Sequence, residues 1–368
     1  MATEPTIKRS TFLKAAVGAG ALLAAPTVAN AAPRGVQAAT AGRGVQAVVT
    51  NKVKDLTGPG LTNQFRMQAT DLGIPARTPD GRLLFMFGDT FEDPYVGGGW
   101  WRSPVALWSN TTNLASGVTW SGAVGGAAAQ QLWDYPHDNP TFSTVLPSDV
   151  ITVGGSMYLH AMVNKGLGNV VWTEIWRSDN SGANWYHTGA KFPSDIDGGL
   201  FQLLTWGLGN DGYVYVYSTG FQRDKPIILK RVRSDQIANP AAYEPWGYRD
   251  GAWNWGNPAT PILNGSFGEM SLRPLGGKWV LTWFNAGDYR IDGMIMDTPA
   301  SNLYTAYRQT LIYGGAWGQE NDNHVAQLYG GYIIPGSTLS DMHLSVSQWN
   351  TDAGWPYRVM QFRVRGFG

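Results

Sequence analysis

Glycine-led runs of alternating apolar residues recur five times along this sequence of 368 residues. The runs begin, roughly 50 to 75 residues apart, at Gly81, Gly155, Gly212, Gly277 and Gly331. Each run is rich in aromatic and aliphatic residues and is bounded by turn formers, which is typical of β-strands. After residue 52 only 236–242 offers a helical turn or two. Five near-regular units of several strands predict an all-β protein, a five-bladed β-propeller. A β-sandwich or a pair of all-β modules is the competing interpretation.

A Trp-capped turn supports the propeller. The segment 178–185, Ser-Asp-Asn-Ser-Gly-Ala-Asn-Trp, resembles the Asp-box hairpin of sialidase-type propellers (S-x-D-x-G-x-x-W), with Asn180 in the Asp position. Gly117-Val-Thr-Trp120 echoes the second half of the same motif.

The N-terminus has the organisation of an export signal. Lys8 and Arg9 precede the apolar run 15–25, and Ala29-Asn-Ala31 follows as a cleavage pattern. That run is too short to span a bilayer, so no membrane span is expected. We predict an export signal at 1–31, twin-arginine-like or Sec, a flexible leader at 32–51, and one catalytic propeller domain at 52–368. The protein is expected to be secreted.

Composition excludes several functional classes. The chain has no cysteine, which removes disulfides, thiolate metal sites and thiol catalysis. Its formal charge is zero and it has no basic block, so no nucleic-acid partner is expected. The five histidines lack zincin spacing, and neither a nucleophile elbow nor a phosphate loop occurs. We therefore expect no cofactor and no catalytic metal. A structural Ca²⁺ could be accommodated, although nothing in the spacing requires one. We expect a monomer.

Two aspartates stand out because charged residues make up only 15% of the chain. Asp71 lies in Thr-Asp-Leu-Gly, and Asp89 closes the apolar run Phe85-Met-Phe-Gly. A carboxylate at the end of a buried strand needs a partner or a function. A turn separates the two segments, so they are expected to be adjacent strands whose carboxylates meet at one end of the channel. The structural alternative is that Asp89 caps the following loop.

Asp149 and Glu269 occupy comparable positions, each shortly before the Gly-led strand of its unit. Propeller symmetry would place both near the central channel, and carboxylates gathered there suit glycoside hydrolysis, which needs an acid and a base or nucleophile. The alternative is a structural ion pair or a hairpin cap, for which Arg66, Arg102 and Arg273 are available.

Aromatic residues are abundant, with 17 Trp, 16 Tyr and 13 Phe. Aromatic rings pack well against the C–H faces of sugars, so Trp100, Trp101 and Trp133 are candidate substrate-binding platforms. Trp253 and Trp255 lie in a similar loop. Each could instead fill space between blades, and for the adjacent pair 100–101 we expect one of each role.

At these residues the sequence resembles the actinobacterial endo-D-arabinanases, glycoside hydrolase family 183, formerly a domain of unknown function. The matching motifs, spread over roughly 55–365, are Thr70-Asp-Leu-Gly73, Phe87-Gly-Asp-Thr-Phe91, Pro147-Ser-Asp149, Gly268-Glu-Met-Ser271 with Lys278-Trp279, and Tyr329-Gly-Gly-Tyr-Ile333. The resemblance implies a propeller that hydrolyses internal α-D-arabinofuranosyl linkages in the arabinan of mycobacterial cell walls. It also implies that Asp71 and Asp89 are the catalytic pair, with Asp149 and Glu269 supporting or binding substrate.

The leading hypothesis is therefore a secreted endo-D-arabinanase acting on arabinogalactan or lipoarabinomannan, and we favour inversion of the anomeric centre. The alternative is a non-catalytic carbohydrate-binding propeller at the cell surface. A sialidase-like exo-enzyme is disfavoured, because no arginine triad is evident in the sequence.

Overall fold

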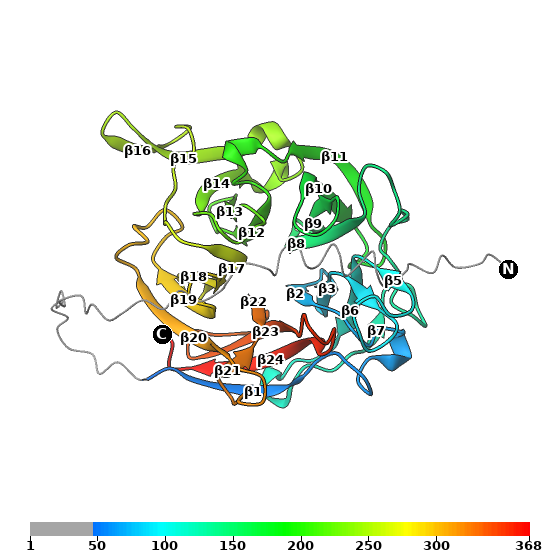
Figure 1. Cartoon of the computed structure of the whole chain (residues 1–368). Helices are drawn as coiled ribbons and strands as arrows, with labels where there is room; N and C mark the ends of the chain where they lie inside the picture. Colours follow the sequence, from blue (N-terminus) through cyan, green and yellow to red (C-terminus); the bar gives the residue numbers. More distant parts are fainter. Residues whose placement is uncertain (1–46) are drawn as a thin grey trace.

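Five sheets of four or five strands surround a central axis in a computed structural model that describes residues 47–368 (Figure 1). The prediction of an all-β, five-bladed propeller is confirmed. Blade 1 contains β2 (Leu72–Arg77), β3 (Leu83–Phe87), β6 (Val105–Ser109) and β7 (Gly122–Ala123), with a small extension of β4 (Thr90–Phe91) and β5 (Trp101–Arg102). Blade 2 contains β8 (Thr144–Val153), β9 (Ser156–Asn164), β10 (Val170–Ser178) and β11 (Tyr186–Pro193).

The other three blades follow the same plan. Blade 3 contains β12 (Leu203–Leu208), β13 (Tyr213–Thr219), β14 (Ile228–Arg233), β15 (Glu244–Arg249) and β16 (Ala252–Trp255). Blade 4 contains β17 (Phe267–Leu275), β18 (Lys278–Asn285), β19 (Arg290–Met296), β20 (Tyr307–Gly315) and β21 (His324–Ala326). Blade 5 contains β22 (Leu328–Ile333), β23 (Asp341–Trp349), β24 (Tyr357–Arg365) and β1 (Val49–Asp55). Short 3₁₀ turns occur at Asn63–Phe65, Leu114–Ser116, Ile196–Gly198, Ser234–Gln236 and Pro240–Ala242.

Strands β2, β8, β12, β17 and β22 are the innermost of their blades, and each contacts the next around the ring, with β22 returning to β2. Hydroxyl side chains tie innermost strands to strands of the neighbouring blade. Ser148 Oγ accepts from Leu204 N at 2.7 Å, and Ser347 Oγ accepts from Leu72 N at 2.8 Å. Because buried hydroxyl bonds of this kind fix the relative position of strands, the central ends of the blades form a defined frame for side chains.

The five Gly-led runs occupy two different positions within their blades. The runs led by Gly81, Gly155, Gly212 and Gly277 form second strands β3, β9, β13 and β18, whereas the run at Gly331 belongs to the innermost strand β22. The second strand of blade 5 is β23, which starts at Asp341 without a preceding glycine.

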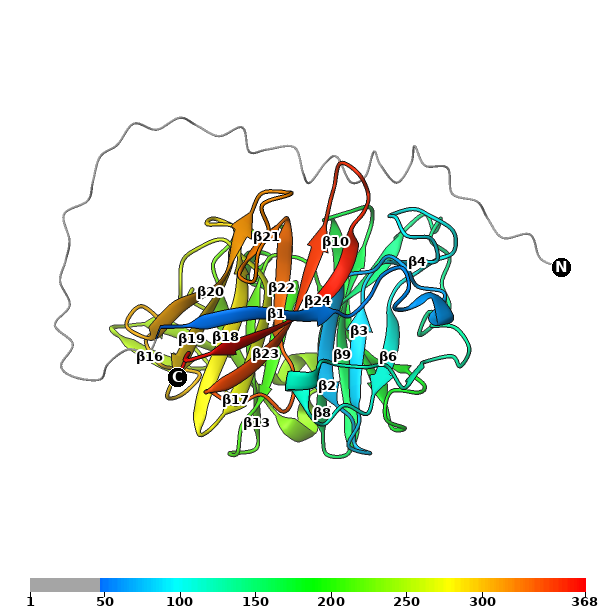
Figure 2. The same ribbon diagram turned by 90° about the horizontal axis from the view of Figure 1, so that it is seen from below.

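The N-terminal strand closes the ring. β1 pairs antiparallel with β24 from Val49–Arg365 to Asp55–Met360, and Figure 2 shows the two lying side by side. The propeller thus begins at Val49, inside the predicted leader, because these residues supply the outermost strand of blade 5. The predicted signal at 1–31 and most of the leader lie outside the described residues.

The Asp-box-like segment forms the turn between β10 and β11, as such hairpins do. Asn180 Oδ1 accepts from Asn184 N at 2.9 Å, and the buried Trp185 donates from Nε1 to Gly182 O at 3.0 Å. Asn180 therefore serves the turn through the oxygen that an Asp would offer. Within 47–368, no helix is long and apolar enough to cross a membrane.

Candidate active site

Asp71 and Asp89 leave the same end of the β2–β3 hairpin, as predicted. Leu72 pairs with Phe87, and Gly88 N donates to the carbonyl oxygen of Asp71 at 3.3 Å. Just beside the two aspartates, the hydroxyls of Thr70 and Thr90 lie 2.7 Å apart. Asp71 immediately precedes innermost strand β2, so both carboxyl groups belong to the channel mouth where the innermost strands begin. We call this end the carboxylate mouth.

Glycine is required between these strands. A Cβ on Gly88 would lie 2.5 Å from Asp71 Oδ1, closer than side-chain carbons approach a neighbour. The Phe-Gly-Asp sequence therefore does more than make a turn, because only a residue without a side chain leaves room for the carboxylate beside it.

Asp71 is held by tyrosines of blade 5. Its Oδ2 accepts a 2.8 Å hydrogen bond from Tyr329, and Tyr357 also bonds to its side chain. Its Oδ1 is buried without a hydrogen-bond partner. Burial, followed by the negative charge of Asp89, raises the pKa of Asp71 to about 7 despite the two tyrosine hydrogen bonds. Near neutral pH this carboxyl group can therefore hold a proton.

Asp89 is 7% exposed and sits among donors instead. Its Oδ1 accepts from Trp101 Nε1 at 2.7 Å and from Thr144 Oγ1 at 2.8 Å. Burial raises the pKa of Asp89 to about 6, and the bonds from Thr144 and Trp101 limit that rise. Each aspartate has two side-chain donors that lower its pKa, and the higher pKa of Asp71 comes from the negative charges of Asp89 and Glu269 beside it.

Glu269, on β17, reaches the same region and is 3% exposed. One oxygen, Oε1, is paired with Arg223, while Oε2 is buried without a hydrogen-bond partner. The Arg223 guanidinium also lies 5.0 Å from the centre of the Tyr329 ring. The negative charge of Glu269 adds to the rise in the pKa of Asp71. Blades 1, 3, 4 and 5 therefore contribute to one cluster of charged and phenolic groups.

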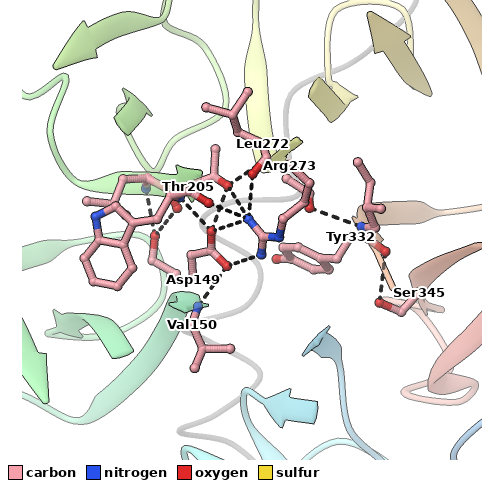
Figure 3. A network of polar contacts seen from close by, with 12 residues as sticks. Asp149, Val150, Thr205, Leu272, Arg273, Tyr332 and Ser345 are labelled. Atoms are coloured by element: carbon pink, nitrogen blue, oxygen red, sulfur yellow. Dashed lines mark hydrogen bonds and ion pairs between the residues drawn. The ribbon is translucent and has the colours of Figure 1, made fainter. Parts of the chain in front are cut away.

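Asp149 lies deeper and is wholly buried, at 0% exposure. Arg273 from β17 donates to both its oxygens, at 2.7 and 3.0 Å, in the network that Figure 3 displays. Thr205 Oγ1, Trp206 N and Val150 N donate to the same carboxylate. The expectation that Asp149 binds substrate is corrected, because its oxygens are all engaged in a structural ion pair that links blades 2, 3 and 4. Of the arginines proposed as partners, Arg273 is the one used.

The three candidate tryptophans differ from one another. Trp101 donates to Asp89 and stacks on His137 with ring centres 3.7 Å apart, so it positions a carboxylate.

The Trp100 ring lies against two arginines. The guanidinium groups of Arg66 and Arg102 are 4.9 and 4.1 Å from its ring centre, which fits packing within blade 1. Trp133 stacks on Trp176 at 3.9 Å and stays partly exposed.

Sequence reasoning missed four groups that contact these carboxyl groups, which are Tyr329, Tyr357, Thr144 and Arg223. Tyr329 begins a motif quoted above, so its importance was visible without its role. Arg223 lies in the β13–β14 loop, in a left-handed conformation with φ of 61°, and no local pattern marks it.

No group of three or more His, Asp or Glu side chains suited to a metal ion occurs among residues 47–368. The acidic groups at the carboxylate mouth are instead engaged by tyrosine, tryptophan, threonine and arginine side chains.

Comparison with known proteins places the chain in a family. The profile of DUF4185, a domain of unknown function, matches residues 57–363. The chain belongs to the DUF4185 family. An uncharacterised 35.9 kDa protein from Mycolicibacterium smegmatis is 31% identical over 322 residues, which cover 82% of this chain and 94% of that protein. The notoamide biosynthesis cluster protein J′ of Aspergillus versicolor is 30% identical over 316 residues, or 78% and 83% of the two chains.

Solved structures share the fold of this DUF4185 protein. A candidate hydrolase from Bacteroides ovatus aligns with a TM-score of 0.59 at 12% identity, covering 88% of this chain and 93% of that one. A GH43_1 enzyme from Xanthomonas citri aligns with a TM-score of 0.50 at 12% identity, over 83% and 90%. At these identities the likeness concerns architecture alone, and chemistry must be argued from the residues.

Proposed function

We propose that this DUF4185 protein is a secreted glycoside hydrolase that cleaves internal α-D-arabinofuranosyl linkages of mycobacterial-type arabinan, in arabinogalactan and lipoarabinomannan. The observation that carries the proposal is the pair Asp71 and Asp89, one partly buried and one buried carboxyl group on one hairpin, with pKa values of about 7 and 6. Glycoside hydrolysis uses two such groups in different protonation states. The propeller fold of a GH43_1 enzyme is compatible with this chemistry.

In the proposed reaction Asp71 is the general acid. Its higher pKa keeps it protonated, so this carboxyl group is assigned to deliver the proton to the leaving glycosidic oxygen. Asp89 is the base. It takes a proton from the water that attacks the anomeric carbon while the glycosidic bond breaks, which inverts the configuration. Trp101 and Thr144 stabilise the ionised form that the base requires.

Glu269 and Arg223 are proposed to bind the substrate. Glu269 Oε2 is an acceptor without a partner, suited to a sugar hydroxyl, and Arg223 holds the other oxygen in place. Substrate identity rests on the ordered motifs that resemble the endo-D-arabinanases. The Mycolicibacterium smegmatis relative is consistent with that assignment but has no assigned activity of its own.

A comparison of two substrates tests the proposal. Product analysis by mass spectrometry on D-arabinan and on plant L-arabinan should reveal a ladder of oligosaccharides from D-arabinan alone. Binding of D-arabinan without any release would favour the non-catalytic alternative. Cleavage of L-arabinan alone would contradict the substrate assignment.

The two carboxyl roles can be separated with an activated aryl α-D-arabinofuranoside. Such a leaving group needs no protonation, so Asp71→Asn should keep far more activity on it than on D-arabinan. Asp89→Asn should lose both activities. If Asp89→Asn kept activity on the activated substrate and Asp71→Asn lost it, Asp89 would be the acid and Asp71 the base.

Export by residues 1–31 is part of the same proposal. Expression in an actinobacterial host should place the mature protein in the culture medium, with an N-terminus near residue 32. Retention of the full-length chain inside the cells would contradict it.

A further inference from the structure

A strip of aromatic rings runs from the outer strands of blade 3 across β13 to β18 of blade 4, away from the carboxylate mouth. It is formed by six residues, Tyr248, Trp253, Trp246, Trp255, Tyr215 and Trp279, and we call it the aromatic strip. Neighbouring ring centres lie 5.6, 6.1, 4.9, 6.0 and 5.3 Å apart in that order. The hairpin β15–β16, which carries the first four rings, projects from the propeller at the upper left of Figure 1.

Strand periodicity explains how four rings share one face of the hairpin. Trp246 pairs with Trp255 and Tyr248 pairs with Trp253, so alternate residues of both strands point to the same side. These cross-strand contacts stabilise the hairpin. They leave much of the outer rings uncovered, since Tyr248 is 53% and Trp253 39% exposed. The backbone of the hairpin pairs with β14 at Lys230–Pro245 and Arg231–Glu244, and Trp246 and Trp255 pack against the core.

The inner end of the strip opens into a cavity of about 640 Å³ between blades 3 and 4. Tyr215 and Trp279 line it together with polar groups that include Asn210, Asp211 and Lys278. The cavity is bounded by the turns Gly209–Gly212 and Gly276–Gly277, which follow innermost strands β12 and β17. Because the carboxylate mouth lies where innermost strands begin, this cavity belongs to the opposite face of the propeller.

Both cations along the strip are paired with carboxylates. Arg231, whose guanidinium lies 4.1 Å from the centre of the Trp255 ring, is paired with Glu244 at 2.7 Å. Lys278 is likewise paired with Asp297 at 2.5 Å. Asp211 accepts a 2.6 Å hydrogen bond from the neutral Tyr215 hydroxyl and keeps its negative charge. Two exposed rings, Tyr248 and Trp253, backed by four rings that pack against the core, suit a neutral, polyhydroxylated chain because the cations beside them are paired. This surface offers little to a nucleic acid or an anionic membrane, which need unpaired cations.

We propose that the aromatic strip and its cavity form a second carbohydrate-binding site, which holds a neutral polysaccharide chain away from the catalytic carboxyl groups. Rings would stack on sugar faces, and Asn210, Asp211 and Lys278 would bond hydroxyls at the cavity end. That the bound chain is arabinan rests on the proposed function. The site would hold the enzyme on an insoluble wall polymer while the carboxylate mouth cleaves a different segment.

The test uses the full propeller carrying Asp89→Asn, so that binding is measured without cleavage. Added Trp253→Ala or Tyr248→Ala should weaken binding to insoluble mycobacterial arabinogalactan about fivefold to tenfold, as loss of one ring platform would. Tyr186→Ala is the matched control, because Tyr186 is a tyrosine 46% exposed on blade 2. It should bind as the parent does. Thermal midpoints of all variants identify any that fail to fold.

A second measurement separates binding from a merely structural role. With Asp89 restored, Trp253→Ala should slow hydrolysis of insoluble arabinogalactan while kcat and KM on a short soluble D-arabino-oligosaccharide stay unchanged. Trp253→Phe should recover most of the loss. Unchanged binding by both strip variants, or no binding of arabinogalactan by the Asp89→Asn parent, would overturn the proposal. If the wild type hydrolyses nothing yet strip variants still lose binding, the second site stands and the proposed activity fails.

Discussion

The indole of Trp101 donates a 2.7 Å hydrogen bond to the carboxylate of Asp89. The bond depends on the small β4–β5 extension of blade 1, in which Phe91 pairs with Trp101 and so returns the indole to the strand end where the aspartate lies. Stacking of Trp101 on His137 fixes the orientation of the ring. A tryptophan that looks like a sugar platform in the sequence is thus a positioning residue for the proposed base.

Replacing Trp101 by Phe should therefore change the pH dependence of catalysis. The variant keeps the ring but loses the donor, so the ionised form of Asp89 becomes less stable and its pKa rises. We expect the acidic limb of the pH–rate profile to move to higher pH, and kcat at pH 6 to fall about tenfold. Trp108→Phe, which removes a donor to Ser181 O instead, is the control and should leave the limb in place. An unmoved acidic limb in Trp101→Phe would contradict the role.

The wild-type pH–rate profile should be a narrow bell. Activity should rise as Asp89 loses its proton near pH 6 and fall as Asp71 loses its proton near pH 7. The two limbs belong to an interacting pair, so they are read as values for the pair. Initial rates on soluble D-arabino-oligosaccharides between pH 4 and 9 give this profile. Full activity at pH 9 would exclude a protonated Asp71 as the acid.

The raised pKa of Asp71 should also lower the folding stability of the protein at high pH. The folded-state pKa of Asp71 is raised from 3.8 to about 7, so its contribution to stability is present below pH 3.8 and is lost as pH rises through 7. Asp71→Asn should therefore raise the thermal midpoint relative to wild type at pH 8, and much less at pH 4. Asp80, whose pKa is lowered by Arg82, provides the control, and Asp80→Asn should give no gain at pH 8. Equal midpoint differences at both pH values would contradict the raised pKa.

The Asp149–Arg273 pair should matter for stability and little for catalysis by the folded enzyme. Removing Arg273 leaves the buried Asp149 carboxylate without its ion-pair partner. Arg273→Met should therefore lower the free energy of unfolding by about 3–5 kcal/mol. The double variant Asp149→Leu with Arg273→Met should recover part of that loss. Denaturant unfolding measures both variants. A fully stable Arg273→Met that had lost affinity for substrate would return Asp149 to the binding residues.

Much of the site was predictable because it is local in sequence. Asp71 and Asp89 flank one hairpin, so strand periodicity and a single turn suffice to bring their ends together. Glu269 was found through the approximate symmetry of the units, which places it on an innermost strand. The units are not exact copies of one another, since the Gly331 run lies in the innermost strand of its blade and the other four runs lie in the second.

The rest depends on contacts between blades that no local pattern records. Arg223 reaches Glu269 from a loop 46 residues away, and Tyr329 reaches Asp71 across 258 positions. Whether Asp149 is a binding group or an ion pair depends on Arg273, which lies 124 residues further along the chain. The sequence offered three arginines as possible partners of Asp149. Which of them pairs with it is decided by the packing of β17 against the other innermost strands.

The most direct test of the central claim is release of oligosaccharides from purified mycobacterial arabinogalactan, measured by mass spectrometry for the wild type and for Asp89→Asn. The wild type should release a series of D-arabino-oligosaccharides, and the variant should be slower by about a thousandfold while keeping its fold. Undiminished release by Asp89→Asn would contradict the assignment of Asp71 and Asp89 as the catalytic pair.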